Sequence, residues 1–70
     1  MTKNPIDPLR AKMLELVEAV MDHSGQLRDY ASTPGNIWLA KGELQTLTQL
    51  ASDIETLLED IKQQDAENGY

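Results

Sequence analysis

The sequence has no cysteine, no phenylalanine and only one histidine. Without cysteine these 70 residues can form no disulfide framework and no thiolate metal site. A single histidine cannot supply a cluster of imidazole ligands. Apolar runs are only a few residues long, far short of the roughly 20 residues that a membrane-spanning helix needs. Residues 1–8 also lack the apolar centre of a signal peptide. We therefore expect a soluble, cytoplasmic protein that binds no cofactor, no metal and no membrane.

Basic residues are also scarce, with six Lys and Arg against twelve Asp and Glu and a net charge of −6. Residues 36–70 are the more acidic half and carry two basic and seven acidic side chains. A nucleic-acid backbone is bound by clustered Lys and Arg, and no such cluster occurs here, which disfavours nucleic acid as a partner. An acidic surface suits a basic protein partner, or it simply keeps a small helical protein in solution.

What the chain does have is two series of residues in a seven-residue, mainly apolar pattern, separated by Thr33-Pro34-Gly35-Asn36. Steps of alternately four and three residues place each series along one side of an α-helix. The sequence therefore predicts one all-α domain, an antiparallel hairpin of two helices. The first series is Leu9, Met13, Leu16, Val20, His23, Leu27 and Tyr30, and the second is Ile37, Ala40, Leu44, Leu47, Ala51, Ile54, Leu58 and Ile61.

The ends of the helices are marked by capping and turn residues. Asp7-Pro8 is a good helix start, because Asp accepts a hydrogen bond from a free backbone N–H and Pro needs none at the first helical position. We predict helices over residues 8–31 and 37–64, a turn over 32–36, and loose segments over 1–6 and 65–70. Gly25 and Gly42 each cost roughly 1 kcal/mol within a helix. The apolar pattern continues through both, which favours unbroken helices over a helix that ends at Gly25.

Several apolar residues lie outside the two series, namely Leu14, Val17 and Met21 in the first half and Leu50 and Leu57 in the second. Stripes this wide are typical of helices that contact two neighbours in a bundle. Burying one Leu or Ile contributes about 1.5–3 kcal/mol. We therefore expect two hairpins to form a homodimeric four-helix bundle. The predicted dimer interface consists of Leu14, Val17, Met21, Leu47, Leu50, Ile54, Leu57 and Ile61.

The only tryptophan lies at the bend, within Ile37-Trp38-Leu39. One interpretation is that Trp38 closes the end of the core against Tyr30 across the turn. The other is that Trp38 is an exposed anchor for a partner, since Trp and Tyr are enriched among the residues that dominate binding energy. The predicted partner-binding residues are Tyr30, Ile37, Trp38 and Leu39.

No group of residues predicts catalysis, so we expect that the protein is not an enzyme. His23 lies in the first apolar series and is interpreted as a packed, hydrogen-bonded residue. Its neighbour Asp22 points about 100° away around the helix, and Ser24 has no base and orienting acid in the spacing of a nucleophile. Glycines are too scattered for a phosphate-binding loop. A dimer that opens when His23 gains charge at acidic pH is a minor alternative.

These features favour an interaction protein that binds and inhibits or modulates another protein. In length, charge and hairpin layout the chain resembles the very short, acidic helical hairpins that bacteriophages make early in infection to inhibit host proteins. They include quorum-sensing anti-activators aimed at host transcription factors. The resemblance covers most of the chain, with the bend at its centre, and implies a phage-encoded protein that acts in host takeover in the bacterial cytoplasm. It involves no diagnostic motif, so no functional residue is carried over.

Three other functions fit parts of the sequence. A dimeric bundle similar to small plasmid-copy-control RNA binders would use the basic residues of the first half. A DNA mimic would use acidic residues on the outer face of the second helix, an array that Lys62 interrupts. A structural assembly subunit would use the wide stripes only for self-association. The candidate RNA-binding residues are Lys3, Arg10, Lys12 and Arg28, and the candidate mimic residues are Asp53, Glu59, Asp60 and Glu67.

Overall fold

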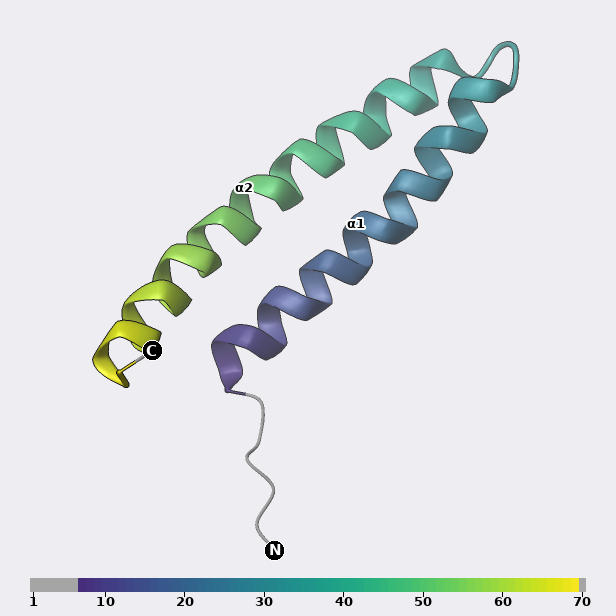
Figure 1. The fold of residues 1–70 in the computed structure, drawn as a ribbon. Coiled ribbons are helices and arrows are strands. Elements are labelled where there is room, and N and C mark those ends of the chain that lie inside the picture. Colours follow the sequence, from purple (N-terminus) through teal and green to yellow (C-terminus); the bar gives the residue numbers. More distant parts are fainter. Residues whose placement is uncertain (1–6, 70) are drawn as a thin grey trace, which may run out of the picture.

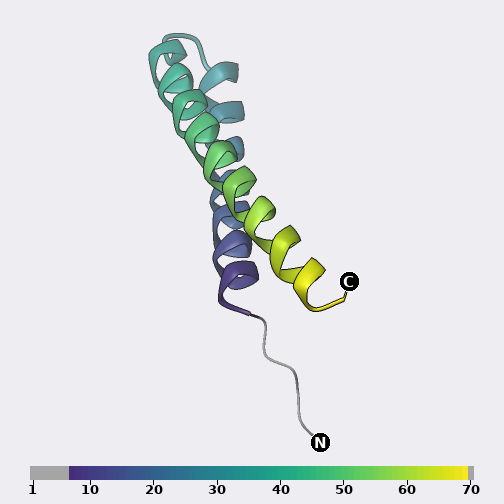
Figure 2. The same cartoon turned by 90° about the vertical axis from the view of Figure 1, so that its left-hand side faces the viewer.

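The computed structural model describes residues 7–69, which form two helices joined by a short turn (Figure 1). Helix α1 spans Pro8–Ser32 and helix α2 spans Ile37–Glu67. The helices run in opposite directions and pack against each other, and a quarter-turn of the molecule shows α2 inclined to α1 (Figure 2). The prediction of an all-α helical hairpin is confirmed. The hairpin measures 53 × 26 × 14 Å, so it is one helix thick and both of its broad sides are open.

Capping groups and a turn glycine set the ends of the helices at the bend and at the start of α1. The Asp7 side chain accepts a hydrogen bond from the Arg10 backbone N–H at 2.9 Å, and Pro8 follows at the first helical position. At the end of α1, the Thr33 N–H donates to the Tyr30 carbonyl at 3.2 Å. Gly35 then reverses the chain with a φ of 91°, a conformation that costs glycine little. Asn36 precedes α2 without a side-chain capping hydrogen bond.

Helix α2 continues further than the sequence indicated. It runs to Glu67, so the prediction that residues 65–70 are loose is wrong for residues 65–67. The extra turn is held because Asp65 pairs with Arg10 of α1 and because the Asn68 N–H donates to the Gln64 and Asp65 carbonyls at 3.1 Å. Both helices pass unbroken through Gly25 and Gly42. The expectation that residues 1–6 are loose lies outside the described residues.

The contact between the helices, called the seam below, follows the predicted series on α1 but not on α2. All seven predicted residues of α1 are half-buried. On α2 the seven-residue pattern of burial includes Glu43, Leu50 and Leu57, whereas Leu44 and Leu58 are 55% and 48% exposed. Because the hairpin has only two helices, residues buried on α2 are covered by α1. The α2 residues of the seam are Ala40, Glu43, Leu47, Leu50, Ile54, Leu57 and Ile61.

The physical reason for this difference is the width of the apolar stripe on α2. The predicted and observed series share Ala40, Leu47, Ile54 and Ile61 and differ only in which neighbouring row turns inward. In the structure the row that packs against α1 is Glu43, Leu50 and Leu57, and the Glu43 carboxylate contacts His23 of α1. Within residues 7–69 only Ala40, Glu43 and Ile61 are classed as buried. The hairpin therefore has a thin core, and small chains of this kind usually gain stability from a further partner.

Candidate protein-interaction surfaces

One broad side of the hairpin carries a line of exposed apolar residues along α2. The line consists of residues spaced by seven, and it is exposed because the neighbouring row of Glu43, Leu50 and Leu57 packs against α1 instead. Its members are Ile37, Leu44, Ala51 and Leu58. Ile37 is 56% exposed and Leu44 is 55% exposed. Residues with this spacing lie one above another on a helix that packs in a two-helix seam. The exposed line therefore runs along α2 from Ile37 to Leu58 beside its contact with α1.

Apolar residues of α1 lie on the same side. An open groove of about 460 Å³ is lined by Val20 and Ser24 of α1 and by residues of α2 that include Ala51 and Leu58. Val17 lies seven residues before Ser24 and so shares its row. Leu14 and Met21 flank Val17 at helical spacing, with exposed fractions of 44% and 67%. We call this surface the lateral face, defined by Leu14, Val17, Met21, Ile37, Leu44, Ala51 and Leu58.

The structure divides the predicted dimer-interface residues into two groups. Leu14, Val17 and Met21 belong to the lateral face. The other five lie in the seam, where α1 of the same chain covers them, and two of these, Leu47 and Ile54, also line the groove. The remaining three are Leu50, Leu57 and Ile61. Four other residues of this face had been assigned to the seam and were not among the predicted dimer-interface residues, although Ile37 was predicted to bind a partner. They are Ile37, Leu44, Ala51 and Leu58. They could have been found only by testing both rows of the wide stripe.

The first turn of α2 exposes three large apolar residues in succession. Trp38 is 79% exposed, Ile37 56% and Leu39 52%. The interpretation that Trp38 closes the core against Tyr30 is therefore wrong, although Tyr30 itself is half-buried. The Lys41 ammonium lies 5.0 Å from the centroid of the Trp38 ring, which is within the range of a cation–π contact. We call Ile37, Trp38 and Leu39 the bend surface; Ile37 belongs to both surfaces.

A polar pair lies within the seam. His23 Nδ1 is 3.0 Å from Glu43 Oε1 and 2.9 Å from Glu43 Oε2. Glu43 is only 9% exposed, so the imidazole provides the hydrogen-bonding partner that a buried carboxylate needs. His23 is packed and hydrogen-bonded as expected. The role of Glu43 was missed because the predicted seam passed through Leu44 instead.

A second polar contact joins the two helices at the end opposite the bend. The Arg10 guanidinium pairs with Asp7 at 3.0 Å and with Asp65 of α2. The hydrogen bond from the Arg10 backbone N–H lowers the pKa of Asp7 below its ordinary value of 3.8, and the Arg10 side chain lowers it further. The two carboxylates raise the pKa of Arg10, Asp65 having the larger effect. One of the candidate RNA-binding cations is therefore engaged within the chain.

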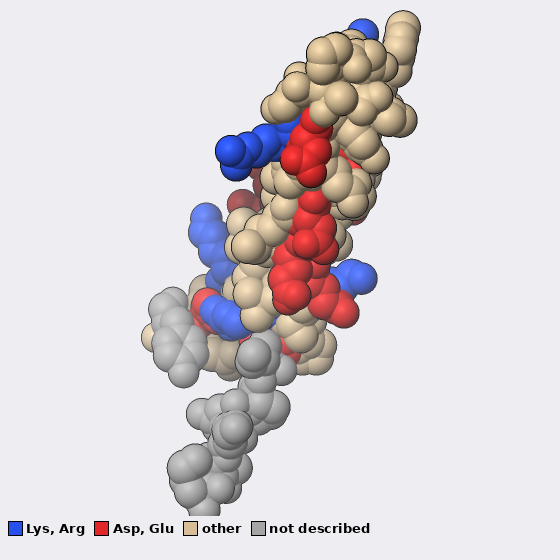
Figure 3. Space-filling model, turned by 90° about the vertical axis from the view of Figure 1, so that its right-hand side faces the viewer, with Lys and Arg blue, Asp and Glu red and all other residues tan. Residues whose placement is uncertain are grey.

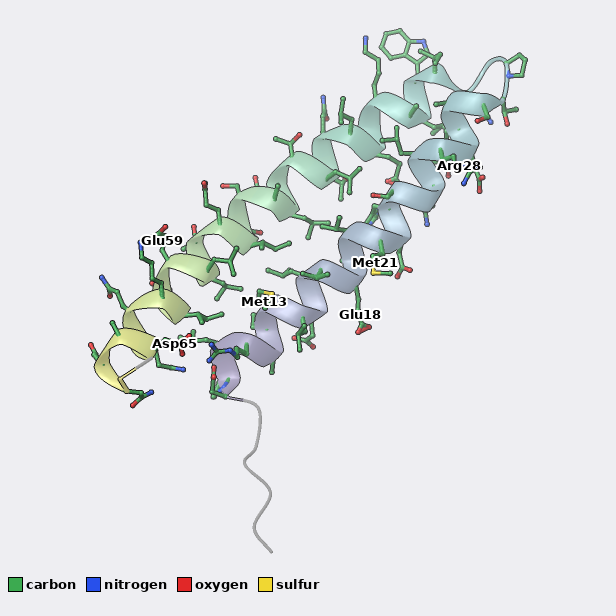
Figure 4. All side chains as sticks on the ribbon, viewed as in Figure 1. Met13, Glu18, Met21, Arg28, Glu59 and Asp65 are labelled. Atoms are coloured by element: carbon green, nitrogen blue, oxygen red, sulfur yellow. The ribbon has the colours of Figure 1, made fainter. Side chains whose placement is uncertain are left out.

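The charges on the outer surface are mainly acidic. Glu15, Glu18, Asp22 and Asp29 are exposed and recur at helical spacing, and an acidic stripe follows the side of the molecule formed by α1 (Figure 3). Glu18 points away from α2, whereas Met13 points toward it (Figure 4). The candidate mimic residues of α2 are exposed too, namely Asp53, Glu59, Asp60 and Glu67.

Of the other candidate cations, Lys12 and Arg28 are exposed and Lys3 lies outside the described residues. Between residues 7 and 69 no helix is long and apolar enough to cross a membrane, and no three acidic, His or Cys side chains come together as metal ligands would. A scan for known protein families and searches of curated proteins and of solved structures found no match to the chain. The case for function accordingly comes from these surfaces.

Proposed function

We propose that this chain is a small, non-enzymatic protein-interaction module that works as a homodimer. Two hairpins pack through their lateral faces into a four-helix bundle, and the bend surface binds a bacterial protein, such as a transcription regulator, and inhibits or modulates it. The observation that carries the proposal is the amount of large apolar surface that a two-helix hairpin leaves exposed.

Support for a homodimer comes from comparing the core with the surface. The hairpin buries few residues, yet Leu14, Met21, Leu44 and Leu58 are each about half exposed or more. Fully burying an exposed Leu or Met contributes about 1.5–3 kcal/mol, so covering the exposed half of one such side chain contributes about 1 kcal/mol. For a domain of this size the sum over several residues is comparable with the whole free energy of unfolding. Association through the lateral face would therefore stabilise the fold itself.

Support for a partner at the bend comes from Trp38. A tryptophan that is 79% exposed contributes little to the fold, whereas Trp is enriched among residues that dominate binding energy. Its neighbours Ile37 and Leu39 extend the apolar surface around the end of α2. The acidic stripe of α1 favours a basic protein as the partner. The resemblance in plan to phage early inhibitors supports a bacterial protein as the target.

The acidic stripe also favours a second candidate function, a DNA mimic that occupies the nucleic-acid site of a basic protein. An RNA-binding role has less support, because Arg10 is tied to Asp7 and Asp65. Competition separates the two protein-binding candidates. A DNA mimic is displaced from its target by duplex DNA and weakened by neutralising Glu18 and Asp22, whereas an anchor-based inhibitor is weakened by removing Trp38.

The experiment that tests the proposal combines oligomeric state with partner capture. Light scattering on the purified chain should give the mass of a dimer. Affinity capture from bacterial lysate should recover a partner with the wild type and with Gln45→Ala, an exposed control on α2, but not with Trp38→Ala. Identical partners for Trp38→Ala and the wild type, or no partner for either, would show that the bend is not an anchor.

A further inference from the structure

The exposed side of α2 carries a second row of residues beside its apolar row. Lys41, Thr48, Glu55 and Lys62 are spaced by seven and all exposed. Together with the apolar row they alternate in steps of four and three residues, from Ile37 to Lys62. Where helices pack, an apolar row forms the centre of the contact and a neighbouring row of charged residues pairs across its edge. On the exposed side of α2 the apolar row and this polar row are arranged in that way, and α1 of the same chain covers neither of them.

This exposed stripe is complementary in charge to the same stripe of a second copy that runs in the opposite direction. Lys41 and Glu55 each lie seven residues from Thr48, on opposite sides. The apolar row has almost the same centre, so reversal places Ile37 opposite Leu58. In a two-fold symmetric dimer the same patch is used on both copies. A reversed second copy centred on the turn of Thr48 therefore brings each Lys41 beside the Glu55 of its partner.

The opposite arrangement, with both bends at one end, lacks this match. It gathers Lys41 and the exposed Arg28 of both copies at the shared bend end, where like charges oppose association. The reversed arrangement separates these cations and gives each Lys41 an acidic neighbour. The Trp38 ring beside the Lys41 ammonium also restricts the lysine side chain before association, which reduces the entropy lost on pairing.

We propose that the lateral face is the docking site of a second copy of this chain, packed antiparallel along α2, with Lys41 of each copy beside Glu55 of the other. This inference rests on the homodimer of the proposed function and assigns its geometry. It places the two bend surfaces at opposite ends of the bundle. Each dimer would then present two Trp38 side chains far apart, one to each of two partner molecules.

A charge exchange between copies tests this geometry. Lys41 and Glu55 are 14 residues apart on one helix, or about 21 Å along its axis, so any coupling between them must act between chains. Lys41→Glu and Glu55→Lys each place like charges at both contacts of their own homodimer. Each variant should raise the Kd of dimerisation roughly tenfold, measured by sedimentation equilibrium at low salt. An equimolar mixture of the two variants pairs opposite charges at both contacts, so its Kd should return to near the wild-type value.

The control is Lys62→Glu, which makes the same charge change in the same row. The position that mirrors residue 62 falls before the first residue of α2, so Lys62 has no matching acidic partner. A heterodimer of Lys62→Glu with Glu55→Lys keeps one Lys41–Glu55 contact and places like charges at the other, so its Kd should lie between those of the wild type and of Glu55→Lys. Lys62→Glu alone should dimerise like the wild type. Because all three positions are exposed, far-UV circular dichroism should show unchanged helix content in every variant.

The outcomes separate the two proposals. A heterodimer Kd that returns to the wild-type value for Lys41→Glu with Glu55→Lys, but stays weaker than wild type for the control pair, supports the antiparallel arrangement. A wild-type dimer whose variants show no recovery on mixing overturns this arrangement and leaves the homodimer of the proposed function standing. A wild-type chain that stays monomeric up to the highest concentration measured overturns both.

Discussion

The seam pair His23–Glu43 gives the sharpest prediction about stability. Glu43 is 9% exposed and both of its carboxylate oxygens lie within 3.0 Å of His23 Nδ1. His23→Leu removes that partner and leaves the carboxylate among apolar residues of the seam. An unsatisfied buried polar group costs about 1–3 kcal/mol. The His23 side chain is 34% exposed, so water can reach part of the site, and we expect His23→Leu to lower the free energy of unfolding by about 1–2 kcal/mol.

The double variant His23→Leu, Glu43→Leu should behave differently. Replacing both partners of a buried polar pair by apolar residues is often neutral or stabilising by about 1–4 kcal/mol. The new Leu at position 43 would complete the inward row of Leu50 and Leu57. We therefore expect the double variant to be at least as stable as the wild type, although His23→Leu alone is less stable.

Urea denaturation followed by circular dichroism measures these differences. All variants must be compared at one protein concentration, because association changes apparent stability. The double-mutant cycle then gives the coupling between the two positions. If His23→Leu is as stable as the wild type, or if the double variant is no more stable than His23→Leu, then the pair does not satisfy a buried carboxylate and the reasoning fails.

Other predictions concern the seam, the glycines and pH. Leu50→Ala should lower the free energy of unfolding by about 1–3 kcal/mol in urea melts, because Leu50 is half-buried. Leu44→Ala should weaken dimerisation and leave the stability of dilute monomer nearly unchanged; equal losses for both variants would contradict the assignment of rows. Gly42→Ala should add about 0.5–1 kcal/mol, because a Cβ there meets nothing within 4 Å, whereas Gly35→Ala, at a φ of 91°, should cost about 1 kcal/mol. Both are checked by thermal melts. Because the pKa of Asp7 is lower in the folded than in the unfolded chain, its contribution to stability is complete above its ordinary value of 3.8 and is lost as the pH falls through the folded value. Asp7→Asn keeps a capping oxygen and should flatten that part of the acid titration; an unchanged curve would show that the cap is not the cause.

The helices and the bend were readable from the sequence because their signals are local. Asp7-Pro8 starts a helix and Pro34-Gly35 interrupts one whatever the rest of the chain does. The seam of α1 was also predictable, since only one seven-residue series there is apolar enough. The row of α2 that turns inward was not predictable in this way. The two candidate rows differ by about 100° around one helix, and the row with more apolar residues is the one left exposed.

The sequence pattern indicated the wide apolar stripe of α2 but not which row of that stripe packs against α1. Placing Glu43 in a seam looks unfavourable until His23 is known to lie across from it, and that pairing depends on how the two helices align in three dimensions. The position of Trp38 likewise depends on the three-dimensional arrangement of the two helices and not on the local sequence pattern. Its side chain could pack over Tyr30 or point away, and the path of the chain through the turn at Gly35 decides between them. The lateral face and the bend surface could be defined only once the structure showed which row of α2 packs inward and where Trp38 lies.

The contact of Arg10 with Asp7 and Asp65 affects how the molecule comes apart. A hairpin is joined covalently at one end only, and its helices separate most easily at the other, where chain ends fray first. In this chain the free end is held by a charged side chain that bridges both helices. Opening from that end must break this bridge as well as the apolar contacts of the seam. The two helices are thus connected at both extremities, by peptide bonds at one and by electrostatic attraction at the other.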